Sequence, residues 1–178
     1  MSRLFGSLCQ IGYVVNDIEA AMQHWVQRLG IGPWFYIERL AVLDFAYMGQ
    51  PSPVELSLAL ANSGAIQIEL IQQRNSADSL YRDYGWDADR ELYREGVQHL
   101  GYGTYHFAAN VTKALEHGYT LGQCGTTGTR GAFAYFLPNG YRDEQAIELI
   151  DLAHGRSELF AAIKAASISW GGEDPIRT

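Results

Sequence analysis

Apolar and polar residues alternate in several short stretches of the chain, and each stretch predicts a β-strand. In residues 7–15 the alternation separates a face with Gln10 and Gly12 from an apolar face. Residues 18–29 instead carry apolar side chains at helical spacing behind Asp17, a typical helix N-cap. Further strands are predicted at residues 34–38, 43–48, 54–60 and 65–72. The first half of the chain therefore has the predicted order β-α-β-β-β.

The second half repeats this order after a connector. Residues 74–96 are rich in charge and tyrosine without a sustained period, which favours a solvated linker with a helical part at residues 88–93. The elements predicted after it are a strand at 99–105, a helix at 110–117, and strands at 120–123, 132–137 and 146–152. A glycine- and threonine-rich mobile loop is expected at 125–131, a helix at 157–166 and an irregular tail at 169–178.

Two short motifs occur twice and in the same order. Ile-Glu-Leu-Ile stands at residues 68–71 and 147–150, and a polar residue precedes an apolar-Gly-Tyr triplet at both Gln10 and His99. Repetition at this scale indicates two copies of one supersecondary unit. We therefore expect a single α+β domain. Its parts are a first repeat at 6–73, a connector at 74–96, a second repeat at 97–152 and a C-terminal extension at 153–178.

Four polar residues occupy matched places in the two repeats: Gln10, Glu69, His99 and Glu148. Each lies on the strand face opposite the apolar residues expected to pack on a helix, and all four converge if a pseudo-twofold axis relates the repeats. Burying a Glu between large apolar residues is costly unless the carboxylate is paired or coordinates a metal. The alternative is an open antiparallel face on which all four contact water. Their matched register favours a metal site. Three glycines are expected to leave space for a substrate beside it: Gly12, Gly101 and Gly103.

Composition restricts the partners. The net charge of −7 argues against nucleic acid or an anionic membrane as the general partner. The two cysteines, Cys9 and Cys124, form no disulfide framework or zinc-ribbon spacing, which is typical of a reducing cytoplasm. No apolar stretch is long enough to span a bilayer. The eleven tyrosines and four tryptophans suit either the wall of a cavity or an aromatic core.

With these motifs the chain resembles the vicinal oxygen chelate superfamily of glyoxalases, bleomycin resistance proteins and ring-cleaving dioxygenases. The resemblance rests on the doubled strand–helix pattern, the helix start at residues 17–21 and the two Ile-Glu-Leu-Ile strands. It implies two βαβββ modules whose sheets curl into a U-shaped, half-barrel cleft around one metal ion, usually in a homodimer. The family's ligand positions fall on Gln10, Glu69, His99 and Glu148. Residues 96–100 look most like the methylmalonyl-CoA epimerase branch, whereas the ligand set is one that the glyoxalase I branch shows.

The resemblance also implies a chemistry. Three oxygen ligands and one imidazole suit Mn²⁺, Co²⁺, Ni²⁺, Zn²⁺ or Mg²⁺. Such an ion stabilises an enolate, so that a carboxylate base removes the proton next to a carbonyl. The candidate bases are Glu148, Glu69 and Glu55, of which Glu55 is expected on the cleft side of its strand, with a surface position as the alternative. Arg130 and Arg142 are candidates for holding a substrate anion, although exposed arginines need no such role.

The leading hypothesis is a cytoplasmic, divalent-metal-dependent isomerase or epimerase. Its substrate would be a small molecule with neighbouring oxygens, and an acyl-CoA is one candidate. One alternative is a glyoxalase-like lyase on a substrate other than glutathione. The other is a metal-free binding or resistance protein, which Gln10 keeps open because an amide is a weak ligand.

Overall fold

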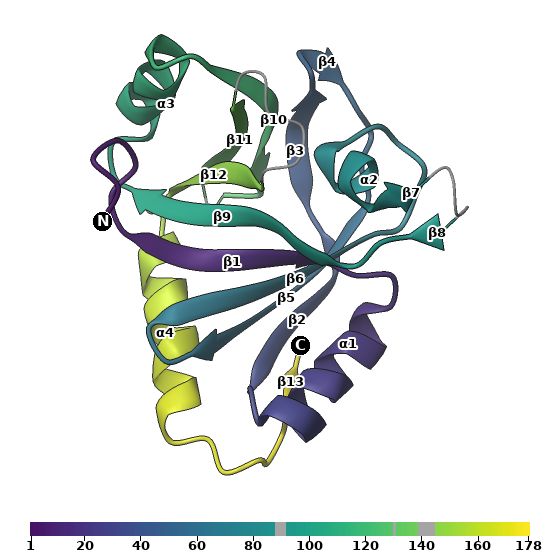
Figure 1. Ribbon diagram of the computed structural model, residues 1–178. Helices are drawn as coiled ribbons and strands as arrows, with labels where there is room; N and C mark the ends of the chain where they lie inside the picture. Colours follow the sequence, from purple (N-terminus) through teal and green to yellow (C-terminus); the bar gives the residue numbers. More distant parts are fainter. Residues whose placement is uncertain (88–91, 130, 139–144) are drawn as a thin grey trace.

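The protein is a mixed α+β structure built around one curved sheet (Figure 1). The computed structural model describes residues 1–87, 92–129, 131–138 and 145–178. Its helical segments are α1 (Ile18–His24), the π-helical turn η1 (Trp25–Leu29), α2 (Leu80–Gly85), α3 (Phe107–Glu116) and α4 (Arg156–Ile168). Its strands are β1 (Leu8–Val14), β2 (Trp34–Leu40), β3 (Val42–Tyr47), β4 (Gln50–Pro51), β5 (Leu56–Ser63), β6 (Ile66–Gln73), β7 (Trp86–Asp87), β8 (Leu92–Tyr93), β9 (Gly96–Thr104), β10 (Tyr119–Thr127), β11 (Ala132–Pro138), β12 (Ala146–Asp151) and β13 (Ile176–Arg177).

Each half of the large sheet has the same strand order, reversed about the centre. The order is β2-β5-β6-β1 in the first half and β9-β12-β11-β10 in the second. β1 runs parallel to β6, β9 runs parallel to β12, and β1 and β9 pair antiparallel at the centre. Since α1 follows β1 and α3 follows β9, the predicted pair of βαβββ modules is confirmed.

The helix of the first module begins and ends at the predicted residues. Asp17 is its N-cap, and its side chain accepts a hydrogen bond from the Ala20 amide at 2.9 Å. Gly30 ends the helical segment in the left-handed conformation, with φ of 64°. The buried side chains of Ile18 and Met22 pack in one cluster with residues of β5 and β6. The opposite face of these strands is thereby left to form the site.

The hairpin of β3 and β4 belongs to the first half of the sequence but extends the second half of the sheet. β3 pairs antiparallel with β10, with Tyr47 opposite Gln123, and β4 pairs with β3. At the other end of the sheet, β13 pairs parallel with β2. Both additions cover a module edge whose backbone groups would otherwise lack partners. Alternation predicts that a segment is a strand, but it does not say which edge that strand joins.

The C-terminal helix covers the inner face of the sheet. Alternate residues of β5 point to opposite faces, so that Leu58 and Leu60 pack in one cluster with Ile163 of α4. Ala59 and Ala61 pack in the cluster that contains α1. Accordingly, α1 and α4 lie on opposite sides of the first module's strands (Figure 1). The described residues contain no helix that is long and apolar enough to cross a membrane.

The connector between the modules differs from the predicted solvated linker. It contains α2, and the side chains of Leu80 and Tyr81 are buried in the main core cluster. Of the helix expected at 88–93, residues 88–91 lie outside the described residues, and Leu92–Tyr93 pair with β7 as a strand. Two apolar side chains are enough to anchor this short helix in the core. They are too few to produce a recognisable helical periodicity in the sequence.

The expected loop and tail are also more regular than predicted. β10 continues to Thr127, because its glycine- and threonine-rich end pairs with β3 and β11. The tail contains β13, and the ring of Trp170 fills the space beside Gly32, where a Cβ atom would come within 2.7 Å of it. In both places pairing with a distant strand overrides a local sequence typical of a loop.

Candidate metal centre

Strand register brings the two first-strand polar residues together at the centre of the sheet. Across the β1–β9 pair, Gln10 lies opposite Gly101, and His99 lies opposite Gly12. Directly paired residues of adjacent strands place their side chains on the same face. The polar residue of each module therefore faces the glycine of the other.

The two last-strand carboxylates flank this central pair. Glu69 on β6 is paired with Gly12 on β1, and Glu148 on β12 is paired with Gly101 on β9. Both glutamates are buried, as are Gln10 and His99. All four predicted ligands thus come from adjacent strands of one chain, two from each module.

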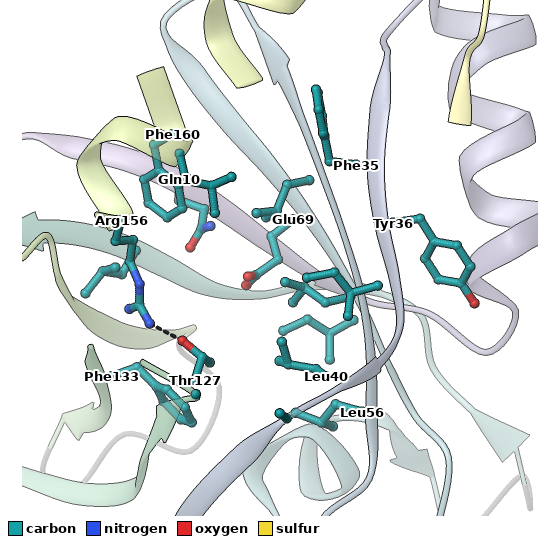
Figure 2. A pocket seen from close by; sticks show the side chains of 18 of the residues that line it. Gln10, Phe35, Tyr36, Leu40, Leu56, Glu69, Thr127, Phe133, Arg156 and Phe160 are labelled. Atoms are coloured by element: carbon teal, nitrogen blue, oxygen red, sulfur yellow. Dashed lines mark hydrogen bonds between the residues drawn. The ribbon is translucent and has the colours of Figure 1, made fainter. Parts of the chain in front are cut away.

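Three of the four side chains are in direct contact. The Nε2 atom of His99 lies 3.1 Å from Oε2 of Glu69 and 3.2 Å from Oε2 of Glu148. One ligand atom from each residue lies within 4.8 Å of the others. Gln10 lines the same cavity as the two carboxylates. Figure 2 shows Gln10, Glu69 and Arg156 pointing into this cavity from different elements.

Each predicted ligand carries one buried polar atom without a hydrogen-bond partner among the described residues. These atoms are Oε1 of Gln10, Oε2 of Glu69, Nε2 of His99 and Oε2 of Glu148. The two His99 contacts have ion-pair distances but not hydrogen-bond geometry. Leaving four polar atoms unsatisfied in the interior is costly unless something binds them together.

The donor set and its spacing fit a divalent cation. Ligand atoms bound at about 2.1 Å and at right angles to one another lie about 3.0 Å apart. The contacts of 3.1 and 3.2 Å between His99 and the two carboxylates are close to this value. Two carboxylates, one amide oxygen and one imidazole nitrogen are ligands that borderline and hard divalent ions accept.

Polar residues next to the cluster fix the orientation of two ligands. Nδ1 of His99 lies 2.9 Å from Oε1 of Gln98, an acceptor, so Nδ1 carries the proton and the lone pair of Nε2 faces the carboxylates. Nε2 of Gln10 donates to Oε1 of Gln67 at 2.8 Å, which turns Oε1 of Gln10 away from Gln67. Sequence reasoning missed Gln67 and Gln98, although each lies within two positions of a motif residue.

The cluster perturbs its own protonation. Burial lowers the pKa of His99, but Glu148 and Glu69 outweigh burial and raise the pKa to about 9. Burial raises the pKa of Glu69, and the nearby Glu148 raises it further, against the opposing effect of His99. Without a metal, therefore, His99 is protonated at neutral pH and places a positive charge beside Glu69 and Glu148.

The glycines on the two central strands accommodate ligand side chains instead of leaving space for a substrate. A Cβ atom at position 12 would lie 1.8 Å from Cε1 of His99. A Cβ atom at position 101 would lie 2.9 Å from both Cβ and Oε1 of Gln10. Beside Gly103 the space is filled by Leu152. The expectation of substrate space at Gly12, Gly101 and Gly103 is wrong.

The ligand cluster lies at the polar end of a cavity of about 530 Å³, a size typical of small-molecule sites. Leucines of β5, Phe35 and Phe133 form much of its apolar wall. The C-terminal extension completes this wall with Phe160 and Ile163 of α4 and with residues of the tail. The extension thus closes a face of the cleft that the two modules alone leave open.

Two tyrosines link the candidate metal ligands to helix α2 of the segment between the modules. Tyr81 of α2 donates to the hydroxyl of Tyr135 at 3.1 Å, and the ring of Tyr135 lies edge-on to His99 with 4.9 Å between ring centroids. Both tyrosines line the cavity and are buried, and burial raises the pKa of each phenol well above its usual value. They remain neutral hydroxyl groups at physiological pH.

Arg156 is a cavity residue that sequence reasoning missed. It is the first residue of α4, it is buried, and its side chain points into the cavity beside Thr127 (Figure 2). Its position just before a predicted helix carries no periodic or motif signal. The two arginines named as candidates for holding a substrate anion, Arg130 and Arg142, lie outside the described residues.

Glu55 does not belong to the cluster. It is exposed, precedes β5 and is absent from the residues that line the cavity, which receives Leu56, Leu58 and Leu60 from this segment. The prediction that it faces the cleft is wrong because the leucines, which share a face, point inward. Among the described residues, the acidic side chains that line the cavity and could act as bases are therefore Glu69 and Glu148.

The fold and site together define a vicinal oxygen chelate protein, with two βαβββ modules around a buried carboxylate–histidine cluster. The sequence model of the glyoxalase/bleomycin resistance protein/dioxygenase superfamily matches residues 9–136. This match covers most of the chain, and the chain belongs to that superfamily. No curated protein sequence matches the chain.

Solved structures share the fold at low sequence identity. Methylmalonyl-CoA epimerase from Mycobacterium tuberculosis is 18% identical, with a TM-score of 0.51 over 84% of this chain and 89% of that chain. A hypothetical protein from Bacillus halodurans C-125 is 20% identical, with a TM-score of 0.50 over 80% of this chain and 91% of that chain. At these identities the likeness shows the fold alone.

Proposed function

We propose that the protein is a divalent-metal-dependent isomerase or epimerase whose substrate presents neighbouring oxygens to the ion. The observation that carries the proposal is the convergence of three unsatisfied ligand atoms, from Glu69, His99 and Glu148, with a fourth unsatisfied atom, Oε1 of Gln10, in a side chain that lines the same cavity. The superfamily includes many enzymes, and a carbonyl next to an acidic carbon is the feature on which this ligand set would act. When bound, the ion supplies Lewis-acid stabilisation of the negative charge that develops on the substrate oxygen.

The protein's own residues would hold the ligands and move the proton. Gln98 keeps the proton of His99 on Nδ1, so that Nε2 is free to bind a metal. Glu69 or Glu148 would take the proton from the substrate carbon, since both carboxylates line the cavity. For epimerisation, the other of the two glutamates, in its protonated form, would deliver a proton to the opposite face of the same carbon. The two glutamates come from β6 and β12, which lie on either side of the central β1–β9 pair.

The largely apolar wall of the cavity would limit the access of water to the charged intermediate. The wall formed by α4 and the leucines of β5 would shield one side of the site from solvent, which strengthens electrostatic interactions there. An acyl-CoA is one candidate substrate, and its long carrier group would have to leave the cavity through an opening. A homodimer is a further part of the proposal, to be checked by the mass of the protein in solution.

Proton exchange with solvent tests the reaction class. We expect metal-loaded protein in D₂O to introduce deuterium next to a carbonyl in at least one member of a panel of 2-oxo acids, 2-hydroxy ketones and methylmalonyl-CoA. Glu148→Ala should abolish the exchange. NMR or mass spectrometry would detect the label. Metal-loaded protein that exchanges no proton in any of them would contradict the proposal.

One alternative keeps independent support. The predominantly apolar, aromatic lining of the cavity suits a protein that binds a small molecule without transforming it. A lyase would differ from an isomerase in releasing a second product, which the same NMR spectra would reveal.

A further inference from the structure

Arg156 is a buried cation in the wall of an otherwise largely apolar cavity. It lies in the C-terminal extension, outside the two modules, and only 6% of it is exposed. Burying a guanidinium group is costly unless hydrogen bonds and an opposite charge compensate it. The hydrogen-bond and charge partners of the Arg156 side chain therefore show whether its positive charge is compensated within the protein.

The hydrogen bonds of Arg156 all go to neutral oxygens. Nη1 donates to the carbonyl oxygen of Ala132 at 3.0 Å, and Nη2 donates to the carbonyl oxygen of Gly131 at 3.0 Å and to Oγ1 of Thr127. In the part of the chain that the structure describes, Arg156 has no carboxylate within ion-pair distance. These three bonds also leave two of its five N–H groups for another acceptor.

The charges around the cavity indicate what that acceptor is. As ligands of a divalent ion, Glu69 and Glu148 would be ionised, and the ion would balance their two negative charges. The positive charge of Arg156 would then remain without a counterion in the same cavity. A ligand with one negative charge would neutralise it, and a planar carboxylate matches the fork of a guanidinium group.

The remaining wall defines the rest of the ligand. The cavity that Arg156 enters is also lined by Phe133, Leu159 and Phe160 and by the leucines of β5. These residues suit an alkyl or aryl body and offer little to a strongly polar one.

We propose that the cavity binds a monoanionic organic acid with an apolar body and that Arg156 binds its carboxylate. This inference rests on the proposed function in one respect, namely that the metal site holds the neighbouring oxygens at the same end. Arg156 is then the residue that selects an acid over a neutral compound of the same shape. Arg39 and Arg177 also line the cavity, but Arg39 is exposed, and Arg177 is only partly buried with its guanidinium over Phe35, 5.7 Å from the ring centroid.

A matched pair of ligands tests the selection. Isothermal titration calorimetry would compare 2-oxo-4-phenylbutanoate with 2-oxo-4-phenylbutanamide, which share the body and the neighbouring oxygens but differ in charge. We expect wild-type protein to bind the acid at least about tenfold more tightly than the amide. Arg156→Gln should reduce this ratio below about threefold. Lys164→Gln removes a charge from the exposed side of the same helix and should leave the ratio unchanged.

Two results would overturn the inference: a wild-type protein without preference for the acid, or the same preference in folded Arg156→Gln. Circular dichroism would show whether that variant folds. If it does not, a crystal structure of wild-type protein with the acid decides. The inference holds if the carboxylate lies within hydrogen-bond distance of Arg156 and fails if it lies elsewhere.

The metal content of the same samples separates this inference from the proposed function. Protein with one metal ion per chain but no Arg156-dependent preference would overturn this inference alone. Protein that binds no metal but retains the Arg156-dependent preference would overturn the metal-based function and leave the acid site in place.

Discussion

The two modules share a strand pattern but contribute unequal side chains to the centre of the sheet. The first module supplies an amide, Gln10, and the second an imidazole, His99, at equivalent positions of β1 and β9. Each of these side chains occupies the space above the glycine of the other module. The site is therefore reciprocal, because neither module can hold its own ligand without a glycine in its partner.

The two central ligands, His99 and Gln10, differ in how far their side chains can move. The rigid ring of His99 would lie only 1.8 Å from a Cβ atom at position 12, whereas the flexible side chain of Gln10 would lie 2.9 Å from one at position 101. His99 also has a partner adjacent in sequence, Gln98, while Gln10 depends on Gln67 of another strand. The second module thus provides the fixed ligand and the first module the adaptable one.

Alanine at the two glycines should have the largest effects and should differ between the modules. Gly12→Ala forces the His99 ring out of place. We expect it to abolish metal binding and to lower the free energy of unfolding by about 3 kcal/mol. At Gly101→Ala, Oε1 of Gln10 can rotate away and its Cβ atom needs to move by only a few tenths of an ångström, so a loss of about 1 kcal/mol with metal retained is expected. Urea denaturation and elemental analysis would measure both. Equal losses would remove the distinction between a fixed and an adaptable ligand.

Removing the supporting amides should have an intermediate effect. Gln98→Leu takes away the acceptor that orients His99, and we expect the metal affinity to fall about 10- to 100-fold. Gln67→Leu frees only the amide of Gln10, a weak ligand, and should cost less than about tenfold. Titration of Zn²⁺ against a competing chelator would give both affinities. A larger loss for Gln67→Leu would reverse the ranking of the modules.

The pH dependence of stability should distinguish metal-free from metal-loaded protein. The pKa of His99 is raised to about 9 in the folded, metal-free protein, above the ordinary value of 6.5. The protonated ring therefore contributes stability that is fully present below about pH 6.5 and is lost as the pH rises through 9. Metal-free protein should lose thermal stability across this interval, and protein saturated with Zn²⁺ should lose much less. Parallel melting curves for the two forms would contradict this role of His99.

Glu55→Gln should have the smallest effect. Glu55 is exposed and does not line the cavity, so we expect metal content and deuterium exchange to equal those of wild-type protein. A lost exchange activity with normal metal content would return Glu55 to the list of candidate bases.

The sequence predicted those features that depend on local periodicity and on repetition. The two motif pairs led to the four polar residues and to the doubled module, because a period of two decides which side chains share a face. Glu55 was assigned to the wrong face because alternation defines two faces without saying which of them is concave. Packing of Leu56 and Leu58 under α4 settles that choice in the folded protein.

Features that depend on distant contacts could not be predicted. Arg156 enters the cavity only because α4 folds back across the first module. The amino-acid sequence around residue 156 contains no periodicity or motif that predicts this packing. Likewise, β3 crosses to the edge of β10, and Leu80 and Tyr81 become core residues of a segment rich in charge. In each case the determining partner lies far away in the sequence.

The central claim, that the two modules jointly hold a divalent metal ion, is tested most directly by metal content. Wild-type protein purified without chelator and a Glu148→Ala variant would be compared by elemental mass spectrometry. The account predicts about one divalent ion per chain in the wild type and almost none in the variant. It would be contradicted by a variant that retains its metal. It would equally be contradicted by a wild type that remains without metal after exposure to Mn²⁺, Co²⁺, Ni²⁺, Zn²⁺ and Mg²⁺.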